Sequence, residues 1–532
     1  MRKIGCGRLW SLTEAANKKE STRMFVRSSP APIRIPLPHG SIPEAKGEDL
    51  DLINVAHSHL IHSEWDKLHP LSYSLTPFRV KHILLKLQND HVLSLRFFNW
   101  LLKHNPSSHT LQTHSILLHT LTKNRRFKTA ETIFRKLLSS SSTIHLPSKI
   151  FEALLHSYRL CNSSPSVFDS LFKTFAHTNK LRNATDTFIR MKVYGFFPTV
   201  ESCNAFLSSL LHLQRPDIAL SFYREMRRGY VYPNVYTLNM VICAYCKLGE
   251  LQKALEVLEK MKDMGLSPNV VSFNTLISGC CNKGLLGMAL KVKSLMGNNG
   301  VHPNVVTFNT LINGFCKERK LHEANGIFAE MKVANVAPNV VTYNTLLNGY
   351  GQVGNCEMGG RLYEEMVRNE VKPDILTYNA LILGLCKDGK TKKAAGLVRE
   401  LDKENLVPNA STFSALITGQ CVRNNSERAF HIYTTMIRGG CSPNQNTFQM
   451  LISAFCKNKD FDGAVQVLRD MLDRLITPDS GTLSELYSGL CRCGKNRLAL
   501  DLCNEMEARH LLPEGFDKEK IAISHSENET SN

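Results

Sequence analysis

The stretch "VVTFNTLINGFCK", residues Val305–Lys317, decides the fold. Its apolar residues recur at three- and four-residue steps, which is the spacing of one buried face of an α-helix. Asn309 would lie inside this helix, where asparagine is a poor helix former and has no end to cap. Similar stretches place Asn274 35 residues earlier and Asn344 35 residues later. The chain therefore repeats both the helix and its unfavourable polar residue.

The repeat has a period of 35 residues. Counted from Pro165, ten consecutive repeats run to Glu514 without insertion, and the penultimate residue of each is proline. A column of alanines and a column of methionines share the period, interrupted once each by Gly359 and Leu401. Alanine lets two helices approach closely, methionine fills irregular gaps, and proline stops the second helix. One helical hairpin cannot bury both of its apolar faces, so neighbours must stack, which predicts an all-α superhelix (solenoid) of tandem 35-residue hairpins.

The sixteen cysteines raise the question of a metal or redox site, and "CAYC" at 243–246 has the CxxC spacing. Seven of them follow the repeat, however, with one cysteine per repeat on an apolar helix face. These are Cys246, Cys281, Cys316, Cys386, Cys421, Cys456 and Cys491. Free cysteine behaves as a small apolar residue, so we interpret this column as buried packing and predict no metal and no cofactor.

The charge balance favours a polyanionic partner. The chain carries 65 Lys and Arg against 47 Asp and Glu, a net charge of +18, which suits nucleic acid or an anionic membrane surface. No apolar run has the length needed to span a bilayer, so we expect no membrane segment.

The regions outside the ten repeats differ in character. The start of the chain bears Arg and Ser and is poor in acidic residues, which is typical of an organellar transit peptide, with a disordered basic tail as the other interpretation. Mitochondrion is the first expected destination and plastid the alternative. The predicted regions are a transit peptide over 1–35, a linker over 36–75, divergent N-terminal helical repeats over 76–164 with a lone helix at 151–158, ten repeats over 165–514, and a polar C-terminal tail over 515–532.

Residues 340–374, "VVTYNTLLNGY…LYEEMVRNEVKPD", carry the resemblance to a known family. Their period and pattern resemble the plant organellar pentatricopeptide repeat proteins in their P-type form. The match is strong over 165–514 and weak over 76–164. The resemblance implies a right-handed α-α superhelix whose first helices line a basic groove, where single-stranded RNA lies with one base per repeat.

In that family the base is read by the fifth and the last residue of each repeat. The matching residues here are Asn204 with Asn234, Asn239 with Asn269, Asn274 with Asn304, Asn309 with Asn339, Asn344 with Asp374, Asn379 with Asn409, and Ser414 with Asn444. Each column has a structural alternative. An Asn or Asp after proline and before a helix is an ordinary cap residue, and the asparagines inside the helices could form a ladder of amides between adjacent repeats.

The amide chemistry suggests a base preference. A carboxamide both donates and accepts, so an Asn pair suits pyrimidines and separates cytosine from uracil only weakly. Ionised Asp374 can only accept, which favours uracil, and the family pattern assigns adenine to Ser414 with Asn444. Repeats 200–444 should therefore prefer four pyrimidines, U, a pyrimidine and A (YYYYUYA). We predict no base for repeats 165–199, 445–479 and 480–514.

Two further columns match family contacts. The family places each base between the apolar second residues of adjacent repeats, here Tyr236, Val271, Val306, Val341 and Leu376. Glu201, Ser411, Asn446 and Gly481 interrupt this column. The thirteenth residues resemble the family's phosphate-binding cations, and their alternative role is a solvated charge at a helix end: Lys247, Lys317, Lys387, Lys457 and Arg492.

The sequence indicates a binding protein rather than an enzyme. It contains no nucleotide-binding glycine loop, no HExxH motif and no deaminase signature. The first hypothesis is a monomeric, sequence-specific RNA binder that acts on organellar transcripts by occupancy, together with organellar RNA-processing proteins and without a small-molecule substrate. The alternative is a helical scaffold that holds a protein or peptide in the same groove.

Overall fold

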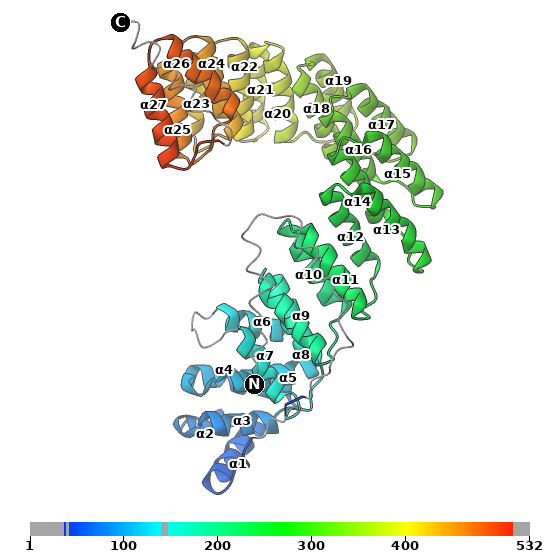
Figure 1. Cartoon of the computed structure of the whole chain (residues 1–532), viewed down its shortest axis with the longest axis vertical. Helices are drawn as coiled ribbons and strands as arrows, with labels where there is room; N and C mark the ends of the chain where they lie inside the picture. Colours follow the sequence, from blue (N-terminus) through cyan, green and yellow to red (C-terminus); the bar gives the residue numbers. More distant parts are fainter. Residues whose placement is uncertain (1–36, 39–41, 140–146, 514–532) are drawn as a thin grey trace, which may run out of the picture. The chain divides into compact units, whose positions relative to one another are not determined.

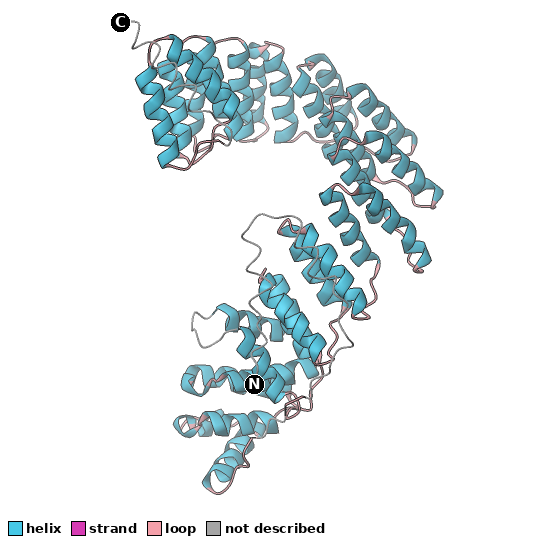
Figure 2. Ribbon diagram, in the orientation of Figure 1, coloured by secondary structure: helices cyan, strands magenta, loops and turns pink. Residues whose placement is uncertain are grey.

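The computed structural model describes residues 37–38, 42–139 and 147–513. These residues form helices joined by short turns, and no strand occurs among them (Figure 2). They fall into two compact bodies that divide between Gly279 and Cys280, called here the N-terminal and the C-terminal body. The predicted transit peptide and the polar tail lie outside the described residues.

The N-terminal body runs to α14, which crosses the division (Figure 1). Its helices are α1 (Glu48–Ile61), α2 (Trp65–Leu68), η2 (Ser72–Ser74), α3 (Pro77–Lys86), α4 (His91–His104), η3 (Pro106–Ser108), α5 (Leu111–Lys123), α6 (Phe127–Ser139), α7 (Pro147–Ser157), α8 (Ser166–His177), α9 (Leu181–Val193), α10 (Val200–His212), α11 (Pro216–Arg228), α12 (Val235–Leu248), α13 (Leu251–Asp263) and α14 (Val270–Asn282).

The C-terminal body continues the same alternation of first and second helices. It contains α15 (Leu286–Asn298), α16 (Val305–Lys317), α17 (Leu321–Val333), α18 (Val340–Val353), α19 (Cys356–Arg368), α20 (Ile375–Lys387), α21 (Thr391–Lys403), α22 (Ala410–Val422), α23 (Ser426–Arg438), α24 (Gln445–Lys457), α25 (Phe461–Asp473), α26 (Ser480–Arg492) and α27 (Asn496–Ala508). Within each body, first helices of adjacent repeats pack on one another, which confirms the predicted all-α stack of hairpins.

The repeat at 305–339 illustrates how one hairpin is bounded. Its first helix starts at Asn304, whose side chain accepts from the backbone N–H of Thr307 at 3.1 Å, while Thr307 Oγ1 accepts from the Asn304 backbone N–H at 3.2 Å. This reciprocal pair satisfies two backbone donors at the helix start. The helix ends at Lys317, and Arg319 adopts φ 57° in the turn to α17. Short polar turns of this kind hold the two helices antiparallel.

The alanine and methionine columns form the core of the stack. Ala289, Ala324, Met296 and Met331 are all fully buried. Their burial explains why the period is so regular, because these positions fix how closely neighbouring helices pack.

The cysteine column packs against glycines of the following repeat. A Cβ added to Gly314 would lie 2.6 Å from Cys281 Sγ, and one added to Gly349 would lie 2.9 Å from Cys316 Sγ. Every cysteine in the described ranges is a free thiol, and no group of three His, Cys, Asp or Glu in them could hold a metal ion. Cys281 and Cys316 therefore act as packing residues, as predicted for their column. Among the residues of the described ranges, no helix combines the length and the apolar character that crossing a bilayer requires.

The linker predicted over 36–75 was wrong for most of its length. Residues 48–61 form α1, whose Ile53, Ala56 and Leu60 are buried, and α1 packs against α3. Asp49 of α1 also forms an ion pair with Arg79 of α3, with 2.6 Å between Oδ1 and Nε. The apolar stripe of α1 contains only three residues, so the sequence pattern did not predict a helix there. Further along, α7 is followed by a turn and then α8, without a second helix of its own.

Candidate nucleic-acid interface

The asparagines at the fifth position form a hydrogen-bond ladder between repeats. Asn309 Nδ2 donates to Asn339 Oδ1 at 3.3 Å, and Thr342 Oγ1 donates to Asn309 Oδ1 at 2.7 Å. One carboxamide thus ties its own first helix to the cap and to the first turn of the next. Equivalent pairs of bonds are made by Asn204, Asn239, Asn344 and Asn379. The ladder explains how these helices tolerate an interior asparagine.

The last residues of the repeats cap the next first helix, as their structural alternative predicted. The side chains of Asn234, Asn269, Asn304, Asn339, Asp374, Asn409 and Asn444 each accept from the backbone N–H three residues on. In every case the acceptor is Oδ1. The Nδ2 groups of Asn234, Asn339 and Asn409 donate no hydrogen bond to any of the described residues, so they remain available to a ligand.

The ladder uses only part of the capacity of each carboxamide. An amide side chain has two N–H donors and an oxygen with two lone pairs. Asn309 spends one N–H on Asn339 and one lone pair on the Thr342 hydroxyl. Asn274, Asn309 and Asn344 are half-buried, whereas Asn204, Asn239 and Asn379 are buried. One donor and one acceptor direction therefore remain on the half-buried Asn309 and Asn344, and base reading stays a prediction.

Within the N-terminal body, several of the predicted contacts line one groove. It has a volume of about 960 Å³ and is lined by Asn204, Asn234 and Tyr236, together with His212 at a thirteenth position. The reading pair, the predicted stacking residue and the thirteenth column thus face the same space. The fifth and thirteenth positions of a helix lie on one face because eight residues complete little more than two turns.

The second-position column is exposed along the first helices. Tyr236, Val271 and Val341 are each 57 % exposed, and Val306 and Leu376 are 56 % exposed. Exposed apolar side chains that recur along successive helices are typical of an interaction surface. Glu201, Ser411, Asn446 and Gly481, which interrupt the column in the sequence, are exposed as well.

The thirteenth-position cations have mixed surroundings. Lys247 Nζ donates to Leu211 O at 3.0 Å, and Lys387 Nζ donates to Gln352 O at 2.8 Å, so both cap the preceding first helix. Burial and the nearby charge of Arg319 lower the pKa of Lys387. Lys317 Nζ lies 3.5 Å from Asn282 Oδ1 of the preceding first helix. Lys247 and Lys387 are thus hydrogen-bonded to the end of the preceding helix, which is a different role from the solvated helix-end charge expected as the alternative.

The other two predicted cations differ. Lys457 is exposed and has no hydrogen bond or ion pair among the described residues, while Arg492 Nε donates to Ser488 O in its own helix at 3.1 Å.

Asp374 changes the polarity of one reading pair. Partial burial opposes its ionisation, but hydrogen bonds from Thr377 and Asn344 outweigh burial and lower the pKa of the carboxyl. Asn344 Nδ2 lies 2.9 Å from Asp374 Oδ1, shorter than the 3.1–3.4 Å of the Asn–Asn pairs. Charge assistance accounts for the shorter bond. Asp374 is thus an ionised acceptor.

Sequence reasoning missed part of the groove. Arg135, Lys173 and His177 line it upstream of Asn204. His177 and His212 hold the thirteenth position of their repeats, so the thirteenth-position column continues towards the N-terminus with histidines. Arg135 belongs to α6, in the divergent helical repeats over 76–164, to which we assigned no contact residue.

The stacked hairpins and their continuous polar column define an α-solenoid repeat protein. Two descriptions of repeat families match the chain and together cover more than half of it. The PPR repeat family matches residues 233–282, 268–317, 303–351, 338–387, 373–422, 408–457 and 447–492, and the PPR repeat matches residues 201–231 and 488–511. The chain belongs to the pentatricopeptide repeat family.

The relatives share part of their length with this chain. A mitochondrial pentatricopeptide repeat-containing protein of Arabidopsis thaliana is 62% identical over 209 residues, which are 39% of this chain and 40% of the relative. A second mitochondrial one from Arabidopsis thaliana is 31% identical over 171 residues, 31% of this chain and 26% of the relative. The chain thus matches less than half the length of either relative.

Among solved structures, the crystal structure of the pentatricopeptide repeat protein PPR10 from maize is similar at 18% identity with a TM-score of 0.40, over 90% of this chain and 86% of that chain. The structure of PPR10 in complex with an 18-nt psaJ RNA element has 18% identity and a TM-score of 0.37, over 88% of this chain and 85% of that chain.

Proposed function

We propose that the chain is a sequence-specific binder of single-stranded RNA that acts on mitochondrial transcripts by occupying its site. The observation that carries the proposal is the groove in which Asn204, Asn234 and Tyr236 lie together. Family membership supplies the ligand class, and the net charge of +18 suits a polyanion. The basic start of the chain and the mitochondrial relatives support the destination.

The proposed target is read with one base per repeat across residues 200–444. The Asn pairs accept pyrimidines, the pair of Asn344 and Asp374 favours uracil, and the pair of Ser414 and Asn444 favours adenine, giving YYYYUYA from 5′ to 3′. Occupancy of such a site would stabilise an RNA end, guide end processing or splicing, or open a transcript for translation.

The sharpest test exchanges an acceptor for a donor without disturbing the fold. Asp374→Asn keeps a cap residue that serves equally well at Asn339 and Asn409. We expect the preference for uracil over cytosine at this position to disappear, a loss of about two- to tenfold because one hydrogen bond is worth roughly 0.5–1.5 kcal/mol. The reciprocal variant Asn339→Asp should gain a uracil preference at the position read by repeat 305–339.

Binding of short RNAs with a single U-to-C change measures both effects. A preference that stays unchanged in both variants would contradict base reading by the last residue. A randomised-RNA selection that returns purine-rich sites would reject the proposed target.

A peptide-binding scaffold is the second candidate, because the exposed column of Val306, Val341 and Leu376 would suit an apolar peptide as well as a base. The two candidates respond differently to salt. RNA affinity falls steeply with ionic strength as counterions are released, whereas binding of an apolar peptide changes little.

A further inference from the structure

The groove of the N-terminal body extends beyond the first predicted reading pair. Past Asn204 it is lined by Lys173 and His177 of α8, by Arg135 of α6 and by Glu201 of α10. None of these residues belongs to a predicted reading pair, and no base was assigned to repeat 165–199. The question is what this end of the groove binds.

Repeat 165–199 is not equipped to read a base. Its fifth residue, Asp169, accepts from the Thr199 backbone N–H at 2.8 Å through Oδ1 and from Thr199 Oγ1 at 3.0 Å through Oδ2. Both carboxylate oxygens therefore bond the cap of the next helix, and Asp169 does not line the groove. The second residue is Ser166, which offers no apolar surface for stacking.

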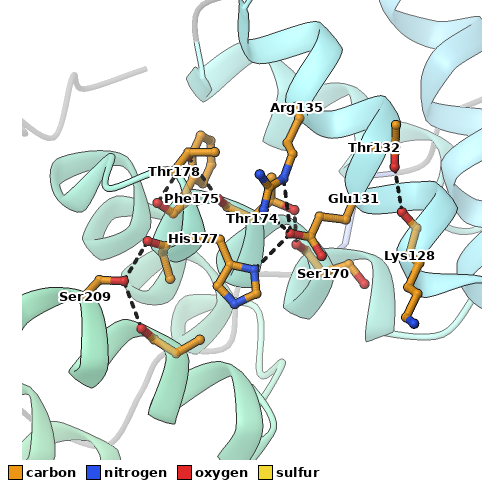
Figure 3. A network of polar contacts seen from close by, with 12 residues as sticks. Lys128, Glu131, Thr132, Arg135, Ser170, Thr174, Phe175, His177, Thr178 and Ser209 are labelled. Carbon is orange, nitrogen blue, oxygen red and sulfur yellow. Dashed lines mark hydrogen bonds and ion pairs between the residues drawn. The ribbon is translucent and has the colours of Figure 1, made fainter. Parts of the chain in front are cut away.

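The same end of the groove carries cations suited to phosphate. Lys173 Nζ has no hydrogen bond or ion pair among the described residues, although it is half-buried. Arg135 is held by Glu131, whose Oε1 lies 3.2 Å from Nε and 2.7 Å from Nη2. Glu131 Oε1 is also 2.9 Å from His177 Nδ1, so one carboxylate orients both side chains (Figure 3).

A guanidinium has five N–H donors, and the bonds to Glu131 use two of them. Three donors therefore remain for a ligand. We propose that this end of the groove, formed by Lys173 and Arg135, binds phosphates of the RNA backbone next to the first base that is read, without reading a base itself. The inference rests on the proposed function and extends it by an anchoring subsite. The carboxylate of Glu201 opposes this binding because it faces the same groove.

The experiment uses the full chain and two RNA probes. One is a heptamer that fits YYYYUYA, and the other is the same heptamer extended at its 5′ end by three abasic ribose phosphates. The abasic residues supply phosphates but no base edge. A heptamer extended in the same way at its 3′ end, and one extended at the 5′ end by three ordinary nucleotides, serve as controls.

We expect the 5′ abasic extension to raise the affinity of the unaltered chain about fivefold at low salt, and this gain should shrink as salt rises because each phosphate contact adds about 0.7 to the salt slope of a single strand. Ordinary nucleotides of any sequence should give the same gain. Lys173→Ala should abolish the gain, whereas Glu201→Gln should increase it. Lys128→Ala removes an exposed cation of α6 that does not line the groove and should leave the gain unchanged.

Three results would overturn the anchoring subsite while the heptamer still binds. The affinity gain could persist in Lys173→Ala, the 5′ extension could give no gain, or the gain could require particular bases. Failure of the unaltered chain to prefer the heptamer over a purine heptamer would instead reject the proposed function and the subsite with it. Circular dichroism of each variant separates these outcomes from misfolding, and the opposite signs expected for Lys173→Ala and Glu201→Gln cannot both arise from loss of structure.

Discussion

Replacing Thr342 with valine removes the donor that links two repeats without changing the shape of the side chain. Thr342 is fully buried. Its hydroxyl lies 2.7 Å from Asn309 Oδ1 and accepts from the Asn339 backbone N–H at 3.1 Å. Asn339 is exposed, so water can replace the second bond, whereas Asn309 Oδ1 loses its partner at a half-buried position. The net cost should be about 2 kcal/mol, the sum of one lost hydrogen bond and one poorly satisfied acceptor.

Thr345→Val is the matched control in the same helix. The Thr345 hydroxyl bonds only Val341 O, four residues earlier, at 2.7 Å, so its loss should cost less than about 0.5 kcal/mol. Stability in a repeat array is local, so the assay is amide hydrogen exchange of α16 and α18. Thr342→Val should accelerate exchange there about thirtyfold, because 1.4 kcal/mol corresponds to a factor of ten. Equal protection in the two variants would refute a stabilising role for the ladder.

Two further predictions concern the packing of the stack. His119 is buried with Nε2 2.9 Å from Leu154 O, and burial lowers its pKa to about 4 from 6.5. Because the unfolded state binds the proton more tightly, the free energy of unfolding is at its full value above pH 6.5 and should fall by about 2 kcal/mol by pH 5. Urea unfolding at several pH values should show a smaller pH dependence in His119→Gln. Gly314→Ala places a Cβ 2.6 Å from Cys281 Sγ and should lower the melting temperature, since overpacking costs about 1–3 kcal/mol, whereas Gly326→Ala meets no atom within 4 Å and should raise it.

The sequence was sufficient for the fold where a residue type has one physical role. Alanine is the clearest case, because the alanine column is buried in every repeat that carries it. The sequence was insufficient for α1, whose short apolar stripe is meaningful only once α3 is there to cover it. The groove residue Arg135 was missed because it lies in the divergent repeats over 76–164, to which we assigned no contact residue.

The ladder was visible in the sequence only as two unrelated columns. Asparagine at the fifth position and threonine or serine at the third position both recur, but Asn309 and Thr342 are 33 residues apart. Their contact depends on how one first helix is offset against the next, which no local pattern specifies. The structural alternatives for the fifth and last residues were therefore identified correctly, while their connection through Thr342 was not.

The ladder is compatible with the proposed base reading, because it leaves one donor and one acceptor direction on Asn309. The Thr342 hydroxyl donates to Asn309 Oδ1 at 2.7 Å, with Asn339 Oδ1 as a second acceptor at 3.1 Å, so a flipped Asn309 amide would lose its hydrogen bond to Asn339 Oδ1. Under the proposed function, the remaining lone pair and N–H are oriented before a base binds, which would lower the entropic cost of binding. Under the same proposal, a constant fifth residue would leave discrimination to the last residue, where Asp374 presents oxygens in place of an amide nitrogen. Repeat 410–444 differs because the hydroxyls of Ser414 and Thr447 bond each other, leaving no carboxamide at the fifth position, and a different base is expected there.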